Sequence, residues 1–314
     1  MSFSTETKNE LARQVPEKKK DQLSEIAGFF RSAGSLRLAG NGKFKILAST
    51  GNPAIARHYK KLLQEYFKIE AGLEIEAVKT LNKGHKYTIT ISPEQNSDQI
   101  LRETGILLVR EGENYISDGI YDVIIRSKGE KKAYLKGQFL ASGYVSDPGK
   151  SYHLEIVTSS EILAQDVKKL MNSFSDISAK IAVRRKKYVV YIKSGIQVRD
   201  MLAIIGADSQ VLIFDEQMLR REMMNDTVRM TNCDNANTDR ILKASEEQRN
   251  IIEELDRKIG LKTLPPNLLE VARLRMEHPE ASLIQIGEML TPKLKKSAVS
   301  DRFAKLKKLL REFE

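Results

Sequence analysis

The sequence is poor in the residues that build disulfides and metal centres. Its 314 residues include one cysteine, Cys233, so neither an internal disulfide nor a cysteine-based metal site can form. The histidines are scattered without the short spacing typical of metal ligands, at positions 58, 85, 153 and 278. The glycine patterns of phosphate-binding and dinucleotide-binding loops are missing as well. We therefore expect no bound metal and no cofactor.

Long apolar segments are also missing. No run approaches the roughly 20 apolar residues that span a bilayer. The opening MSFSTETKNELARQ is polar and lacks the apolar core of a signal peptide. We therefore expect a soluble cytoplasmic protein with no membrane partner, long enough for two domains or for one large domain and a small module.

Acidic residues are fewer than basic residues. Lysine and arginine total 52 against 42 aspartate and glutamate, which gives a formal net charge of +10 and a pI near 9.4. A surplus of this size favours a polyanionic partner such as nucleic acid, although many basic proteins bind nothing anionic. Whether nucleic acid is the partner therefore depends on where the basic residues lie along the chain.

The first part of the chain contains an internal repeat. The segment IAGFFRSAGSL (26–36) matches LKGQFLASGYV (135–145) 109 residues later, so that Gly28, Phe30 and Gly34 fall on Gly137, Phe139 and Gly143. After each segment follow two strand-like runs, joined by Asn41-Gly42 in the first copy and by Pro148-Gly149 in the second. A helix, a second hairpin and a closing helix complete each copy, with residues 110–131 between the copies. The predicted unit is helix, hairpin, helix, hairpin, helix, written twice.

A duplicated unit of this kind predicts two copies packed about a pseudo-two-fold axis, because one sheet with a single apolar face cannot cover itself. The helices that carry Gly28 and Gly137 are the expected contact, since glycine lets two backbones approach closely. Gly34 and Gly143 are expected to be left-handed helix caps. The alternative is two unrelated α+β halves, which the shared order of elements disfavours.

The segment from 208 to 260 is charged and helix-prone. We interpret it as helices that bridge two domains, ended by Gly260. The polar stretch NCDNAN (232–237) is rich in capping residues and is interpreted as a turn between helices.

From Leu264 onward the spacing predicts three helices. Pro266 opens the first and His278-Pro279 ends it. Ser282 and Gln285 form a capping box for the second. After the turn TPKLKK (291–296), Ser297 is expected to cap a third helix whose buried stripe is Val299, Phe303, Leu306 and Leu310. This is the plan of a helix-turn-helix.

Positive charge gathers on the third of these helices and the turn before it. Residues 290–311 hold eight lysines and arginines and one acid, Asp301. A basic helix by itself is more often a solvated face, but here it follows a capped partner helix at helix-turn-helix spacing, which favours DNA binding. We predict that base edges are met by Ser297, Ser300 and Arg302, and DNA phosphates by Lys295, Lys296, Lys305 and Lys308. The run Arg184–Lys187 at a hairpin turn is either an auxiliary phosphate contact or a solvated turn.

The two repeated segments resemble the nonapeptide of the LAGLIDADG homing endonucleases. The resemblance implies that the two glycine-containing helices form the interface between the copies. It also implies that an acid just before each final glycine would hold the catalytic metal ions. Here those positions are Ala33 and Ser142, neither of which binds a hard cation usefully. Arg31 likewise departs from the acid common in the endonucleases, and the nearest carboxylates, Glu25 and Asp147, lie outside the motif position.

The combination of a degenerate LAGLIDADG domain, a helical segment and a C-terminal helix-turn-helix resembles the WhiA family of bacterial regulators. The resemblance extends over nearly the whole chain, including MSFSTETKNEL, the second nonapeptide, NCDNAN and LIQIGEMLTPKLKKSAVSDRFAKL (283–306). It implies a transcription factor linked to sporulation, or to cell division and chromosome segregation.

Together these observations predict an α+β protein that binds double-stranded DNA and is not an enzyme. We expect a duplicated, LAGLIDADG-like pseudo-two-fold domain at residues 1–207, with repeats at about 20–106 and 131–207. A helical linker at 208–260 and an all-α helix-turn-helix domain at 261–314 would follow. Such a protein would associate with the nucleoid, and other transcription or cell-division proteins are further candidate partners. The alternative is a residually active, metal-dependent DNA endonuclease of the LAGLIDADG type.

Overall fold

The computed structural model describes residues 1–40, 42–78 and 84–313. The chain divides into two compact units, Met1–Arg221 and Glu222–Glu314. Among the described residues, no helix is long and apolar enough to span a membrane.

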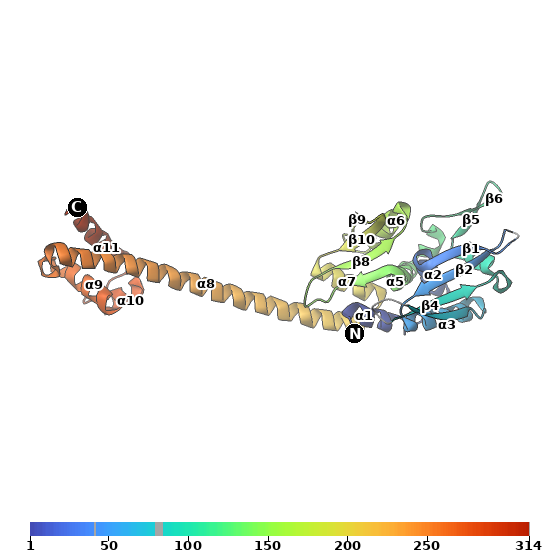
Figure 1. Ribbon diagram of the computed structural model, residues 1–314, viewed down its shortest axis with the longest axis horizontal. Helices are drawn as coiled ribbons and strands as arrows, with labels where there is room; N and C mark the ends of the chain where they lie inside the picture. Colours follow the sequence, from blue (N-terminus) through green and yellow to red (C-terminus); the bar gives the residue numbers. More distant parts are fainter. Residues whose placement is uncertain (41, 79–83, 314) are drawn as a thin grey trace. The chain divides into compact units, whose positions relative to one another are not determined.

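The first unit contains the predicted repeat, in the predicted order of elements (Figure 1). The first copy is α2 (Lys19–Ala33), β1 (Gly34–Leu38), β2 (Phe44–Thr50), α3 (Pro53–Phe67), β3 (Gly72–Val78), β4 (Gly84–Ile91) and α4 (Ser97–Glu103). The second copy is α5 (Lys128–Ser142), β7 (Gly143–Val145), β8 (Leu154–Thr158), α6 (Glu161–Met171), β9 (Lys180–Arg184), β10 (Lys187–Ile192) and α7 (Gly195–Ile205). Asn52 and Ser160 cap α3 and α6. Of the predicted Asn41-Gly42 turn, Asn41 lies outside the described residues.

Each copy forms one antiparallel four-stranded sheet, and the two sheets share one topology. The strand orders are β1-β2-β4-β3 and β7-β8-β10-β9. Corresponding glycines open the first strand of each sheet, with Gly34 opposite Ala48 and Gly143 opposite Ile156. Identical strand order in both halves confirms a duplicated unit and excludes two unrelated halves.

Helices α2 and α5 pack against each other at their glycines, as predicted. A Cβ atom on Gly28 would lie 2.3 Å from the carbonyl oxygen of Tyr134, and one on Gly137 would lie 2.2 Å from that of Glu25. Gly137 is the counterpart of Gly28, and Tyr134 is the counterpart of Glu25, so the two contacts are equivalent. Such reciprocity is what a two-fold axis between the repeats produces.

The expected left-handed caps at Gly34 and Gly143 are wrong. Both residues end their helices, but in extended backbone, with φ of −78° and −77°. Glycine is needed there for space, because a Cβ atom would lie 2.3 Å from the carbonyl oxygen of Phe30 or from the ring of Phe139. The chain can therefore pass from the helix directly into a strand.

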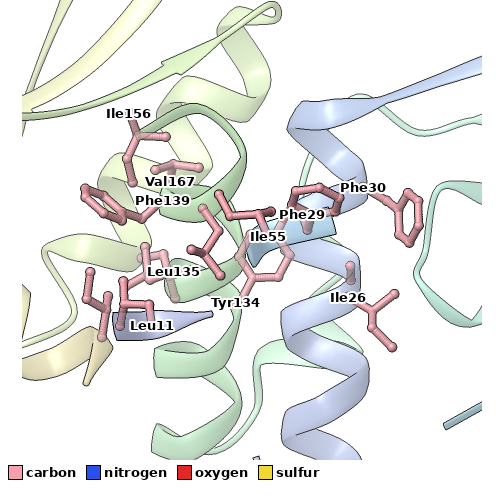
Figure 2. Packing of buried hydrophobic residues seen from close by; sticks show 14 of the residues in the cluster. Leu11, Ile26, Phe29, Phe30, Ile55, Tyr134, Leu135, Phe139, Ile156 and Val167 are labelled. Atoms are coloured by element: carbon pink, nitrogen blue, oxygen red, sulfur yellow. The ribbon is translucent and has the colours of Figure 1, made fainter. Parts of the chain in front are cut away.

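The core of the first unit surrounds these two helices. Figure 2 shows Ile26 and Phe29 on α2, and Leu135 and Phe139 on α5, among its buried apolar side chains. The sheets contribute residues such as Ile46 and Ile156, and both copies share one continuous cluster. This shared cluster is the mutual burial that the repeat predicted.

Further short elements complete this unit. Helix α1 (Phe3–Leu11) is capped by Ser2 and was not foreseen from the sequence. Between the copies lie a small hairpin of β5 (Leu107–Arg110) and β6 (Glu113–Ile116) and a short 3-10 helix, η2 (Asp122–Ile125). Another such turn, η1 (Pro93–Gln95), precedes α4.

The charged segment forms one helix, α8 (Asp208–Ile259), where several helices were expected. The predicted turn at NCDNAN is wrong, because residues 232–237 are helical. The segment from 208 to 259 contains no glycine or proline to interrupt it. Helical ion pairs such as Glu216–Arg220 support it on its exposed face. Gly260 stops the helix as predicted, with φ of +76°.

The second unit gathers α9 (Pro266–Glu277), α10 (Leu283–Met289) and α11 (Lys296–Arg311) around the end of α8 (Figure 1). A short turn, η3 (Leu261–Thr263), connects α8 to α9. Ile252 and Leu255 of α8 belong to the same buried cluster as Val271, Ile286 and Phe303. The three predicted helices therefore pack against the C-terminal part of α8.

Candidate nucleic-acid interface

Local sequence signals place α9 and α10. Pro266 occupies the first turn of α9, where its missing N–H costs no hydrogen bond. Ser282 and Gln285 form the predicted capping box: the backbone N–H of Gln285 donates to Ser282 Oγ at 3.3 Å, and that of Ser282 to Gln285 Oε1 at 2.8 Å. These caps fix where α10 begins relative to α9.

The turn between α10 and α11 is held by Gly287, which the sequence analysis overlooked. The backbone N–H of Leu294 donates to the carbonyl oxygen of Gly287 at 2.9 Å. A Cβ atom on Gly287 would lie 2.2 Å from the carbonyl oxygen of Leu294. A glycine inside a short amphipathic helix was the available signal, because it marks a close backbone approach.

Helix α11 has the two faces that its sequence predicts. Val299, Phe303, Leu306 and Leu310 are buried against α9 and α10. The predicted N-cap is wrong: the helix begins at Lys296, Lys295 is the cap residue, and no side chain caps it. Ser297 instead lies in the first turn and is exposed.

Most of the predicted DNA-binding residues are exposed on α11 or directly before it. These are Lys295, Lys296, Ser297, Ser300, Lys305 and Lys308. None of these four lysines forms an ion pair with any residue in the described ranges. They therefore present positive charge to solvent.

Arg302 lies apart from this group. Its Nη1 donates to the carbonyl oxygen of Asn267 at 3.2 Å and lies 4.0 Å from Glu270 Oε2, both on α9. The side chain is 21% exposed. In this conformation Arg302 joins α11 to α9, and it has to leave Asn267 before it can contact a base.

Arg275 of α9 contacts α8, α11 and the segment before α10, and its role was not predicted from the sequence. Its guanidinium donates to Gln248 Oε1 at 2.9 Å and to the carbonyl oxygen of Ala281 at 2.6 Å, and lies 5.6 Å from the ring of Phe303. Burial lowers the pKa of this guanidinium. The signal was its register, since Arg275 follows Val271 and Ala272 at i+4 and i+3 on the apolar face of α9.

A second link ties α11 to α8. The ammonium of Lys307 donates to the carboxylate of Glu247, and this contact lowers the pKa of Glu247. Lys307 was not among the predicted DNA-binding residues, and its pairing with α8 separates it from the unpaired lysines. The basic face of α11 therefore contains both structural and free cations.

The ends of α2 and α5 lack the acids of a nuclease. Ala33 and Ser142 occupy those positions, and Ser142 Oγ donates back to the carbonyl oxygen of Gln138 at 3.4 Å. Arg31 donates to the carbonyl oxygens of Ser117 and Gly105, so it holds the segment between the repeats. In the described ranges no group of three His, Cys, Asp or Glu side chains gathers as metal ligands.

The two nearest carboxylates are also unsuited to a shared metal site. Glu25 is 0% exposed, and its carboxylate lies 2.6 Å from His58 Nε2 and 3.1 Å from Lys136 Nζ. Asp147 is exposed and accepts a hydrogen bond from the backbone N–H of Gly149 at 2.9 Å. One carboxylate is already engaged by His58 and Lys136, and the other belongs to a loop.

The basic run Arg184–Lys187 forms the turn of the β9–β10 hairpin, as predicted. Arg185 and Lys186 both have positive φ, 48° and 63°, and all four side chains are exposed. Arg184 Nη1 lies 3.3 Å from Glu155 Oε2 on β8. Its role as an auxiliary phosphate contact stays a prediction.

Comparison with known proteins bears on the whole chain. A protein of Thermoanaerobacter sp. (strain X514), named "Probable cell division protein WhiA", is 38% identical over 314 residues, covering 100% of this chain and 98% of that protein. The chain belongs to the WhiA family. A WhiA protein of Alkaliphilus metalliredigens with the same name is 39% identical, covering 98% of this chain and 96% of its own length.

Family models divide the chain in the same way as the repeat. Residues 19–107 match the WhiA N-terminal LAGLIDADG-like domain, and residues 131–224 match the WhiA LAGLIDADG-like domain. Residues 227–310 match the WhiA C-terminal HTH domain. Full-length DUF199/WhiA from Thermotoga maritima superposes with a TM-score of 0.59 at 25% identity, covering 100% of this chain and 99% of that one. The predicted fold class, two LAGLIDADG-like repeats followed by a helix-turn-helix, is confirmed.

Proposed function

We propose that this protein is a sequence-specific regulator of transcription that binds double-stranded DNA through α11 and does not cleave it. The carrying observation is the set of exposed, unpaired lysines along a helix-turn-helix, at positions 295, 296, 305 and 308. Neutralising DNA phosphates with such lysines releases counterions and supplies most of the attraction to any duplex.

Sequence discrimination would come from the start of α11. Ser297 and Ser300 are exposed on its first turns, where a recognition helix meets base edges. Lys305 and Lys308 lie further along the helix and suit phosphates. Arg302 can add a bidentate contact to guanine after releasing Asn267.

The biological setting follows from the family. Relatives named as probable cell division proteins suggest that the regulated genes serve cell division. Sporulation and chromosome segregation are the related processes implied by the family resemblance. A DNA-bound regulator of this kind would work at the nucleoid, in the cytoplasm.

The test uses the full-length protein and genomic fragments recovered by immunoprecipitation of the tagged protein. Affinity is measured across a salt series for a recovered site and for its scrambled sequence. We expect tighter binding to the recovered site, typically by a factor of about 10³ or more, and a steep loss of affinity with salt. Equal affinity for both sequences contradicts sequence-specific regulation.

The alternative function, metal-dependent strand cleavage, is tested in parallel. Supercoiled plasmid carrying the recovered site is incubated with the protein and Mg²⁺ or Mn²⁺. Because Ala33 and Ser142 provide no metal ligand, we expect the plasmid to stay intact. Specific cleavage that is lost in Glu25→Gln or Asp147→Asn would show that a nearby carboxylate compensates.

A further inference from the structure

A pocket of about 480 Å³ lies in the first unit between α1 and the first turns of α3. Its walls come from Thr5 and Asn9 of α1, from the segment 12–15 that follows, and from residues 51–61. A volume of this size suits a small organic ligand and exceeds what a single inorganic ion fills.

The charge of this pocket has one sign. Arg13, Arg57 and Lys61 line it, and none of the described carboxylates does. Neither arginine forms an ion pair with any part of the chain that the structure describes, and Lys61 has only the half-exposed Glu65, 3.6 Å away on the next turn. The first turn of α3, which also lines the pocket, adds the partial positive charge of a helix N-terminus.

Another cavity in the same unit has most of its positive charge offset by acids. Arg126, Lys131 and Lys169 line a pocket between η2 and α6, together with Asp122 and Asp166. Three bases face two acids there, which leaves a net charge of one. The pocket beside α3 keeps its surplus, which favours an anionic ligand carrying more than one negative charge.

Its remaining wall is part fixed amide and part apolar. Asn52 Nδ2 donates to Asn9 Oδ1 at 2.8 Å, which joins α3 to α1 across the pocket. Val15, Ala12 and Pro53 supply apolar surface. A ligand that combines a phosphate group with a larger, less polar moiety matches both kinds of wall.

We propose that this pocket binds a small organic phosphate of nucleotide size. Arginine offers planar, bidentate donors to phosphate oxygens, and two arginines with a lysine suit a group of charge about −2 or more better than one carboxylate. The site shares no residue with α11, so its occupancy can be measured without DNA.

The floor of the pocket connects it to the helix interface. His58 lines the pocket, is 4% exposed, and holds Glu25 of α2 at 2.6 Å. Glu25 in turn meets Lys136 of α5. A ligand resting on His58 therefore stabilises the packing of the two repeats, and binding raises the melting temperature of the first unit.

The experiment titrates the full-length protein with ADP, pyrophosphate and inorganic phosphate, and with adenosine as the uncharged control. Binding is followed by calorimetry and by thermal unfolding in a phosphate-free buffer. We expect ADP to bind and to raise the melting temperature, and adenosine to do neither. In the double variant Arg13→Gln/Arg57→Gln, the ADP affinity falls by at least about tenfold. Replacing Arg57 by Lys instead of Gln in this double variant recovers part of the loss.

The matched control is Lys169→Gln, which removes one charge at the position in α6 that corresponds to Lys61. It should leave ADP binding unchanged. The proposal is overturned by failure of all three phosphates to bind at millimolar concentration. It is also overturned by unchanged binding in the folded double variant. Displacement of ADP by a scrambled DNA duplex would overturn it too, because the pocket would then be a backbone contact for DNA.

Discussion

Arg302 and the lysines of α11 differ in what they contact before any DNA arrives. Arg302 is held by Asn267 on α9, whereas Lys305 and Lys308 are exposed and free of ion pairs among the described residues. The arginine can therefore act on the position of α11, on a base, or on both. The lysines can act only through charge.

These differences predict separable effects on DNA binding. Lys305→Ala or Lys308→Ala should weaken matched and scrambled duplexes alike and lower the salt slope by about one unit each. Arg302→Ala should cost about 1–3 kcal/mol at the matched site and relax discrimination at one base pair. Affinity against salt measures both. Glu270→Gln is the control, since it removes the other contact of Arg302 on α9 and should leave discrimination intact. Unchanged discrimination in folded Arg302→Ala would restrict Arg302 to positioning α11.

Lys8 predicts a dependence of stability on pH. Burial lowers the pKa of its ammonium to about 8 from the ordinary 10.5, and Nζ lies 5.8 Å from the ring of Phe139. Between these two pH values the unfolded chain binds a proton that the folded chain releases, so stability rises as pH rises through this window. Lys8→Met should abolish that rise and add on the order of 1 kcal/mol at pH 7. Urea unfolding at pH 7 to 10 measures it, with exposed Lys18→Met as control; equal pH slopes in wild type and Lys8→Met would contradict it.

At the residue scale, the sequence predicted the buried and exposed faces of α11 correctly but not the residue at which the helix begins. The stripe from Val299 to Leu310 follows the helical period, which is a local property. The helix begins at Lys296, directly after the turn in which Leu294 bonds to Gly287, and this tertiary contact has no signature in the residues around Ser297. The pairing of Lys307 with Glu247, 60 residues apart, has no local signature either.

At the scale of elements, glycine has two roles in each copy, one within the helix and one directly after it. Gly28 and Gly137 permit backbone contact, and Gly34 and Gly143 permit an extended exit. The sequence predicted the first role because the repeat aligns the two residues. It could not separate a left-handed cap from an extended exit, because glycine suits both.

Alanine at the contact glycines tests the interface between the repeats. Gly28→Ala or Gly137→Ala forces the two helices apart at a backbone carbonyl, and each should destabilise the first unit by about 1–3 kcal/mol or more. Gly51→Ala is the control, since its nearest neighbour lies 4.0 Å from the new Cβ, and we expect a change within about 0.5 kcal/mol. Urea unfolding measures both. Equal stabilities would mean that the helices do not pack this closely in solution.

At the scale of the whole molecule, α8 contributes to both cores. Phe214 is buried in the first unit, and Ile252 and Leu255 are buried in the second. Between them, the described side chains of residues 222–240 are exposed. The two cores favour dividing the chain between Phe214 and Ile252 rather than at the predicted limits of 208 and 261.

The fragments that fold alone should follow these cores. We expect limited proteolysis to cut first within 222–244, and fragments 1–221 and 240–314 to fold. Fragment 261–314 lacks Ile252, Leu255 and the Gln248 partner of Arg275, and each lost aliphatic side chain costs about 2–5 kcal/mol, so it should stay unfolded. Circular dichroism and thermal melts of the three fragments decide. A cooperative melt of 261–314 would show that the end of α8 is dispensable.

The bridge between Glu25 and Lys136 makes the two copies complementary rather than interchangeable. The counterpart of Glu25 in the other copy is Tyr134, and the counterpart of Lys136 is Ala27. Two first copies paired with each other would leave each Glu25 with His58 but opposite alanine instead of Lys136, and two second copies would bury two lysines without a carboxylate. Losing one partner of a buried charge pair costs about 3–5 kcal/mol. We therefore expect each half to pair more stably with the other half than with a second copy of itself.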